Sequence, residues 1–175
     1  GNLVGLGDIN LALFAIPFTA IAITGLCNAY NMVDGIDGPA GSLTLVAMCS
    51  LLYLTLHRAP DNEVALVAFL CTSISVFLVF NLKVKGKSKI FMGDAGSLFL
   101  GCSVAIAMIY FSQSGRDIIN PATALWLISI PMMDMASTML GRMQKRQSPL
   151  HADRTDLHHI PMRCGLSQHK ALLCI

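Results

Sequence analysis

Long apolar segments, separated by short polar ones, dominate the chain. Five of them match or approach the ~20 residues that a transmembrane helix needs, and they cover residues 11–32, 40–57, 64–82, 97–112 and 121–141. A further apolar run begins near the end, in "KALLCI". The pattern predicts an all-α, polytopic transmembrane helix bundle with about five complete spans and the start of another. We expect a single membrane-embedded domain over residues 1–175.

Composition agrees with a membrane protein. Hydrophobic residues make up 54% of the 175 positions and charged residues only 13%, whereas soluble domains carry about 25% charged residues. The chain starts without Met and its last apolar run is short, so we expect a portion of a larger protein that lacks N-terminal spans. The six cysteines form no CxxC pair and are expected to behave as small buried hydrophobes.

Lysine and arginine are unevenly distributed over the polar segments. Four lysines lie between residues 83 and 89 and five basic residues between 142 and 163, whereas the alternate loops hold only Arg58 and Arg116. The positive-inside rule therefore places the basic loops in the cytoplasm and the N-terminus outside. The segments "DGIDG", "FMGDAGS" and "HADRTDLHH" are then all expected on the cytoplasmic face.

The first of these segments is part of "NAYNMVDGIDG", where polar side chains recur at every third position. The four residues are Asn28, Asn31, Asp34 and Asp37. Three such steps drift by about 180° around a helix, so one straight helix cannot keep all four on one face. Gly35 and Gly38 predict that the helix ends here, with Asp37 in a turn. Two half-sites on either side of a helix end are favoured; helix capping is the alternative.

The second segment, "FMGDAGSLFLG", places Asp94 between Gly93 and Gly96, with Ser97 opening the fourth predicted span. One interpretation is an N-cap followed by a glycine turn. The other is a carboxylate that holds Mg²⁺ over phosphate oxygens, since Mg²⁺ takes few protein ligands and completes its shell with substrate phosphates. The lysines just upstream attract a polyanionic substrate or serve membrane topology alone.

The third segment, "HADRTDLHHIPMRCG", concentrates histidine, arginine and aspartate. A zinc site through His158, His159 and Cys164 and a plain solvated loop are two interpretations. We favour a basic loop that closes on phosphates or a sugar, for which Arg and protonated His are suited. Separately, Asp134 is the one acid deep in an apolar run, which indicates a functional residue facing the bundle interior. Pro131 can bend its helix.

Together, "NAYNMVDGIDG", "FMGDAGSLFLG" and "HADRTDLHH" resemble the polyprenyl-phosphate N-acetylhexosamine-1-phosphate transferases, and the resemblance covers essentially the whole chain. The "HADR" form resembles the branch that transfers a GlcNAc-type phosphate to undecaprenyl phosphate. The family implies a Mg²⁺- or Mn²⁺-dependent enzyme of the bacterial inner membrane. It would transfer N-acetylglucosamine-1-phosphate, or a related N-acetylhexosamine phosphate, from a UDP-sugar at the cytoplasmic face. UMP would be released, and a cell-surface polysaccharide such as lipopolysaccharide O-antigen would be initiated.

The resemblance also implies partners and residue roles. The partners are a UDP-N-acetylhexosamine, undecaprenyl phosphate and the lipid bilayer; a homodimer is compatible with the family, and no nucleic acid is expected. Metal ligands would be Asp94 and Asn31. Catalytic residues would be Asp34, Asp37, Asp94 and His158. Substrate-binding residues would be Asn28, Asn31, Asp37, Arg154, His158 and His159.

The chain departs from the family pattern in three places. Pro39 stands where the family has an apolar residue, Asp156 stands where a histidine is common, and the family's earlier Asp-Asp pair is missing. We therefore expect the 175-residue chain alone to be inactive. Alternatives are a MurNAc-pentapeptide phosphate transferase, a truncated non-catalytic membrane protein, and an ion-coupled transporter using Asp34, Asp94 and Asp134.

Overall fold

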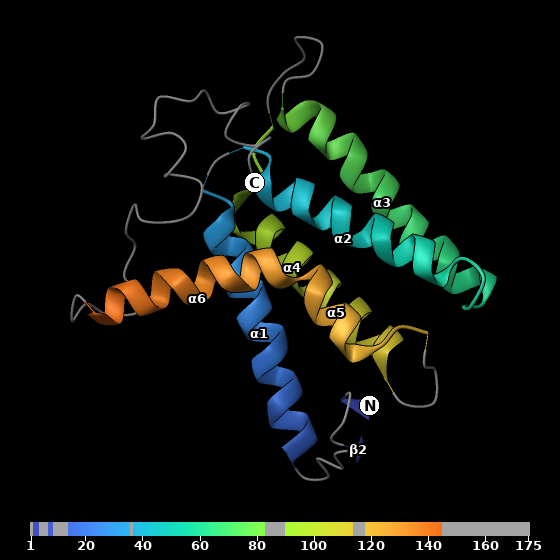
Figure 1. Cartoon of the computed structure of the whole chain (residues 1–175). Helices are drawn as coiled ribbons and strands as arrows, with labels where there is room; N and C mark the ends of the chain where they lie inside the picture. The colour runs from blue at the N-terminus through green and yellow to red at the C-terminus, as the bar shows by residue number, and fades with distance from the viewer. Residues whose placement is uncertain are drawn as a thin grey trace.

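Six helices account for most of the chain that the structure, a computed structural model, describes: residues 2–3, 7–8, 14–35, 37–82, 90–113 and 118–144. The helices are α1 (Ala15–Val33), α2 (Pro39–Thr55), α3 (Asp61–Asn81), α4 (Gly93–Ser112), α5 (Pro121–Leu127) and α6 (Ser129–Gln144). Two-residue strands, β1 (Asn2–Leu3) and β2 (Gly7–Asp8), pair antiparallel near the N-terminus. Over these residues the predicted all-α class is confirmed (Figure 1).

Three of the helices, α1, α3 and α4, are long and apolar enough to cross a membrane. Helix α2 is apolar but has only 17 residues. Helices α5 and α6 pass the same test only as a pair, bent by 67°. The described residues therefore hold three clear candidate spans, or four with the bent pair, and the expected count of five plus one stays a prediction.

The break between α5 and α6 lies at the position expected from Pro131. A proline inside a helix removes one backbone hydrogen bond, and its ring clashes with the carbonyl four residues earlier. That residue is Leu127, the last residue of α5, and Ile128 separates the two helices. The bend expected from Pro131 is thus confirmed.

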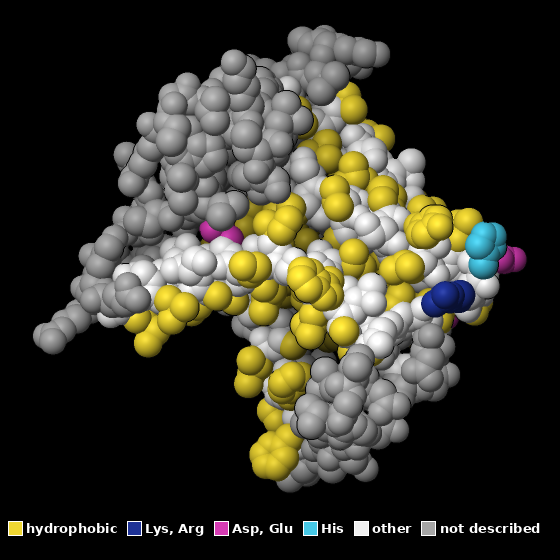
Figure 2. All heavy atoms as spheres, in the orientation of Figure 1, with side chains coloured by type: hydrophobic (Ala, Val, Ile, Leu, Met, Phe, Trp, Pro, Cys, Tyr) yellow, Lys and Arg dark blue, Asp and Glu magenta, His cyan; other side chains and the backbone are white. Residues whose placement is uncertain are grey.

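The helices pack as two groups around a common core. Helix α1 packs against α4 and α6, and α2 packs against α3 and also contacts α4; the pairing of α2 with α3 is visible in Figure 1. The core holds Leu26, Tyr30, Met48, Leu51 and Val104. Large apolar side chains also cover the outer surface, as Figure 2 shows. An apolar exterior fits a lipid environment, where backbone polar groups are satisfied within helices.

The helix ends that carry the polar motifs meet at one end of the bundle. The last turn of α1 is hydrogen-bonded to the first turns of α4. At the end of α3, the buried Asn81 donates from Nδ2 to the Ile90 carbonyl oxygen over 2.8 Å, which holds the end of α3 beside the entry to α4. The expectation that "DGIDG" and "FMGDAGS" share one end is confirmed. That this end faces the cytoplasm stays a prediction, because the lysines of residues 83–89, on which it depends, lie outside the described residues.

The cysteines are expected to be buried, and the structure agrees in part. Cys71 is buried, Cys27 and Cys102 are half-buried, and Cys49 is exposed on the apolar surface. All four are free thiols. Cys164 and Cys174 lie outside the described residues.

Candidate functional site

The "DGIDG" segment forms the turn between α1 and α2. Helix α1 ends at Val33, and Asp34 caps it, with its backbone N–H donating to the Tyr30 carbonyl oxygen over 3.1 Å. Gly38 has a φ of 104°, a conformation that residues with a Cβ rarely adopt. Asp37 therefore lies in the turn, as predicted, while Asn31 lies in the last turn of α1.

Pro39 does not disturb this turn. It is the first residue of α2 and is buried. At the first helical position a proline needs no backbone N–H, and its fixed φ suits the helix. Pro39 thus occupies the first position of α2, where proline is common.

The "FMGDAGS" segment is the beginning of α4 itself. The helix starts at Gly93, whose φ is 66°, four residues before the predicted start at residue 97. Asp94 lies in the first turn, where a negative charge interacts favourably with the positive end of the helix dipole. Its side chain is exposed, so the carboxylate is available to a ligand.

Hydrogen bonds join the two motifs. The Asn31 amide nitrogen, Nδ2, donates to Ser97 Oγ over 3.1 Å and approaches Asp94 Oδ1 at 3.5 Å. Ser97 Oγ in turn donates to the Asp94 carbonyl oxygen over 3.0 Å. The structure therefore brings Asn31 and Asp94 together as expected. It adds Ser97, a fully buried residue that the sequence indicated only as a helix-start residue.

Close helix packing makes this meeting possible. A Cβ built on Gly101 of α4 would lie 2.8 Å from Cys27 Cα and 3.0 Å from the Leu26 carbonyl oxygen, both backbone atoms of α1. Ser97, Gly101 and Ala105 are all buried and recur at four-residue spacing. Small residues at this spacing allow helix backbones to approach closely in membranes.

Negative charge accumulates at this end of the bundle. The pKa of Asp34 is raised from 3.8 to about 6, chiefly by burial and further by the nearby charges of Asp37 and Asp94. Each ionised carboxylate disfavours ionisation of its neighbours, and a bound cation would favour it. The electrostatics of the site therefore suit a cation or a cationic group.

The residues at this end of the bundle offer two oxygen ligands to Mg²⁺, too few to complete its shell without water or substrate phosphates. Among the residues that the structure describes, no group of three or more His, Cys, Asp or Glu side chains is placed to hold a metal ion. Mg²⁺, however, is often held by one or two protein carboxylates together with substrate phosphates. The exposed Asp94 carboxylate and the Asn31 amide oxygen, whose amide nitrogen already binds Ser97 and Asp94, are hard oxygen donors of this kind.

The hydrogen bonds described above involve none of the remaining residues that the sequence indicated as functional. Asn28 lies on an exposed part of α1, one turn before Asn31, and the hydrogen bonds to α4 come from Asn31. Asp134 is 4% exposed on α6, so its expected interior position is confirmed. Arg154, His158 and His159, and with them the zinc alternative, lie outside the described residues.

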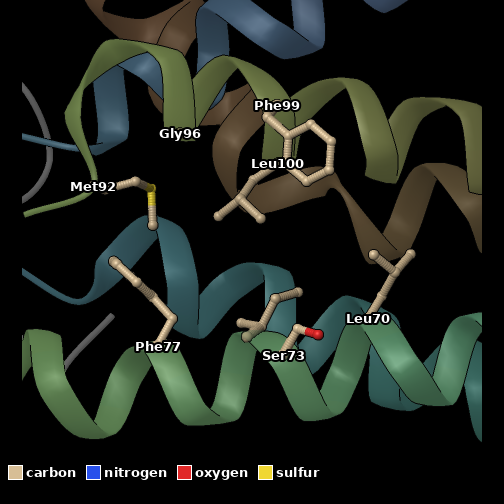
Figure 3. Close-up of a pocket in the computed structure, with 8 residues that line it drawn as sticks. Leu70, Ser73, Phe77, Met92, Gly96, Phe99 and Leu100 are labelled. Carbon is tan, nitrogen blue, oxygen red and sulfur yellow. The ribbon is translucent and has the colours of Figure 1, made fainter.

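A separate apolar pocket of about 280 Å³ lies between α3 and α4 (Figure 3). Met92, Gly96, Phe99 and Leu100 line it from the α4 side, facing Leu70, Ser73, Ile74 and Phe77 of α3. None of the polar residues described above lines it. The polar site is therefore the end of the bundle rather than this pocket.

Comparison with known proteins identifies the family of the chain. The family model described as glycosyl transferase family 4 matches residues 1–112. The chain is 37% identical over its whole length to the undecaprenyl-phosphate alpha-N-acetylglucosaminyl 1-phosphate transferase of Yersinia pestis, and 36% identical to that of Escherichia coli K12. It is 35% identical to the enzyme of the same name from Haemophilus influenzae.

The chain spans about half the length of these curated relatives: 48% for the first two and 50% for the third. No solved structure matches it significantly. The match to the family model covers well over half of the chain, and it includes both motifs that meet at the end of the bundle. The chain therefore belongs to glycosyl transferase family 4.

Proposed function

We propose that the protein to which this chain belongs transfers N-acetylglucosamine-1-phosphate, or a related N-acetylhexosamine phosphate, from a UDP-sugar to undecaprenyl phosphate. UMP is released, and the lipid-linked sugar pyrophosphate initiates a cell-surface polysaccharide. The site works at the cytoplasmic face of the bacterial inner membrane. The observation that carries the proposal is the meeting of Asn31 and Asp94 at the end of an apolar bundle.

The position of the site supports such a reaction. One substrate is soluble in water and the other is anchored in lipid, so the reacting phosphates can meet only at the membrane surface. The polar cluster lies at helix ends: α1 ends at Val33, and α4 begins at Gly93. The remainder of both helices is apolar enough to cross the membrane. A lipid phosphate at the surface could thus reach the cluster without leaving the bilayer.

The chain's own residues would bind and orient the two phosphate groups. When bound, Mg²⁺ or Mn²⁺ would neutralise phosphate charge and polarise the phosphoryl oxygens, and Asp94 and Asn31 are the residues that would hold it. The first turn of α4 adds backbone N–H groups and the positive end of its dipole. Asp37, in the turn before α2, would accept hydrogen bonds from the nucleotide. We assign contacts with the sugar and phosphates to Arg154, His158 and His159 on the basis of the motif alone.

Two anionic substrates make charge neutralisation the main requirement of the site. Without a cation, burial raises the pKa of Asp34, and the nearby charges of Asp37 and Asp94 raise it further. Adding phosphates to such a site would be strongly unfavourable. The charge of the described residues therefore supports the proposed dependence on a divalent cation, and the cation's occupancy should be linked to substrate binding.

The test uses the native protein in membrane vesicles. With undecaprenyl phosphate, Mg²⁺ and UDP-GlcNAc labelled in the sugar, label should enter the lipid phase, and chelation with EDTA should abolish this transfer. Transfer from UDP-MurNAc-pentapeptide but not from UDP-GlcNAc would assign the peptidoglycan reaction instead. Failure with every UDP-N-acetylhexosamine would contradict the proposed function.

A further inference from the structure

Ser97 is buried at the contact between α1 and α4 and takes part in two hydrogen bonds. Its hydroxyl donates to the Asp94 carbonyl oxygen over 3.0 Å and accepts from Asn31 Nδ2 over 3.1 Å. The residue is 0% exposed, so water does not replace either partner. Both motif residues at the site, Asn31 and Asp94, are therefore linked through one hydroxyl.

A count of protons fixes the direction of these bonds. A serine hydroxyl has one proton to donate and lone pairs to accept. Because that proton is directed at the Asp94 carbonyl oxygen, Ser97 can only accept from Asn31. The nitrogen of the Asn31 amide must then face Ser97, and the amide oxygen must face away from it.

The opposite orientation of the amide is unfavourable. Turned by 180°, the Asn31 oxygen would face Asp94 Oδ1, also an acceptor, and Ser97 could donate to it only by giving up its bond to the Asp94 carbonyl oxygen. Two contacts of Asn31 Nδ2 favour the observed orientation of the amide. The contact with Asp94 Oδ1 is 3.5 Å long, at the limit of a hydrogen bond. The 3.1 Å contact to Ser97 is thus the main determinant.

We propose that Ser97 is a positioning residue that fixes the Asn31 amide with its oxygen directed toward the bound divalent cation. This role rests on the proposed function, since it requires a cation at Asn31 and Asp94. Ser97 does not touch the cation or the substrates. It acts through Asn31, in the way that residues behind a metal ligand commonly set the orientation of that ligand.

The experiment measures binding of Mn²⁺ alone to the native protein in detergent, by electron paramagnetic resonance, without substrates. Replacing Ser97→Ala should raise the Mn²⁺ dissociation constant about tenfold, and Ser97→Thr, which keeps the hydroxyl, should restore it. The matched control is Ser103→Ala, also on α4, whose hydroxyl donates to the Phe99 carbonyl oxygen. That variant should bind Mn²⁺ like the unaltered protein.

A second pair of variants removes the dependence on Ser97→Thr folding correctly. An Asn31→Asp carboxylate presents an oxygen in either orientation, so Ser97→Ala should have little further effect on Mn²⁺ binding in that background. Equal losses in both backgrounds, or unchanged binding by Ser97→Ala alone, would overturn the positioning role. If the unaltered protein binds no Mn²⁺, the metal role in the proposed function fails, and the role of Ser97 fails with it.

Discussion

Gly101 offers a sharp test of how the two motifs are brought together. It lies seven residues after Asp94 on α4, and it contacts α1 at Cys27, four residues before Asn31. At 1.5 Å per residue, the contact point is about 10 Å from Asp94 and about 6 Å from Asn31 along the helices. We predict that Gly101→Ala separates the helices and weakens the site without contacting any substrate.

The displacement can be estimated from the structure. The added Cβ would lie 2.8 Å from Cys27 Cα, whereas carbon atoms in contact are about 3.5–4.0 Å apart, so the helices must separate by about 1 Å. The opposing atoms belong to the α1 backbone, and no side-chain rotation relieves the contact. The bond from Asn31 Nδ2 to Ser97 Oγ, now 3.1 Å, would exceed hydrogen-bonding distance if the shift reached it.

The expected loss of activity is large compared with the expected loss of stability. Overpacking a core typically costs about 1–3 kcal/mol, partly offset by about 0.5–1 kcal/mol because alanine favours the helix more than glycine does. A misplacement of about 1 Å in an active site can lower the rate about a hundredfold. The variant should therefore remain folded while losing most of its transferase activity.

The assay compares initial rates of sugar-phosphate transfer and thermal midpoints for purified variants of the native protein. Gly25→Ala is the matched control, because a Cβ on Gly25 of α1 meets no atom within 4 Å. It should keep full activity. A folded Gly101→Ala variant with activity within about twofold of the unaltered protein would refute the claim that close α1–α4 packing positions the site.

Three further predictions concern Asp94, Asp34 and the activity of the 175-residue chain alone. Asp94→Asn should lower transfer more than about a hundredfold, since loss of a metal ligand removes several kcal/mol of charge stabilisation; Asp61→Asn, an exposed acid in the first turn of α3, should not. The pKa of Asp34 is about 6 when folded against 3.8 ordinarily, so ionisation of Asp34 reduces stability as the pH rises from about 4 to about 6. Asp34→Asn should therefore raise the thermal midpoint in metal-free buffer more at pH 7 than at pH 4, and an equal effect at both values would be inconsistent with this pKa. The 175-residue chain alone should give no transfer of labelled sugar phosphate to lipid, because it holds no adjacent pair of aspartates, and measurable transfer would contradict a requirement for that pair.

Much of the local structure could be predicted because it depends on neighbouring residues. The glycines of "DGIDG" correctly indicated the end of α1, and the positive φ of Gly38 explains the turn that carries Asp37. Pro131 correctly indicated a bend. The apolar pattern predicts a start of α4 at residue 97, four residues late, because Gly93 and Gly96 are typical of a turn, whereas Gly96 lies within the helix.

The contacts between α1 and α4 could not be predicted in the same way. The bond from Asn31 to Ser97 joins residues 66 positions apart, and helical periodicity carries no information on which two helices pack together. The one available signal was the spacing of Ser97, Gly101 and Ala105, a small-residue pattern typical of close helix packing in membranes. It indicates a contact face but not the partner helix, which only the folded chain identifies.

The fate of the β-phosphate of the donor tests the central claim most directly. The native protein would be incubated with undecaprenyl phosphate, Mg²⁺ and UDP-GlcNAc labelled in that phosphate, and lipid and water phases would be separated. The account predicts label in the lipid phase, with one UMP released for each labelled lipid, and neither product from Asp94→Asn. Label that stays in water as UDP while the sugar enters the lipid would show transfer of the sugar alone, and would contradict it.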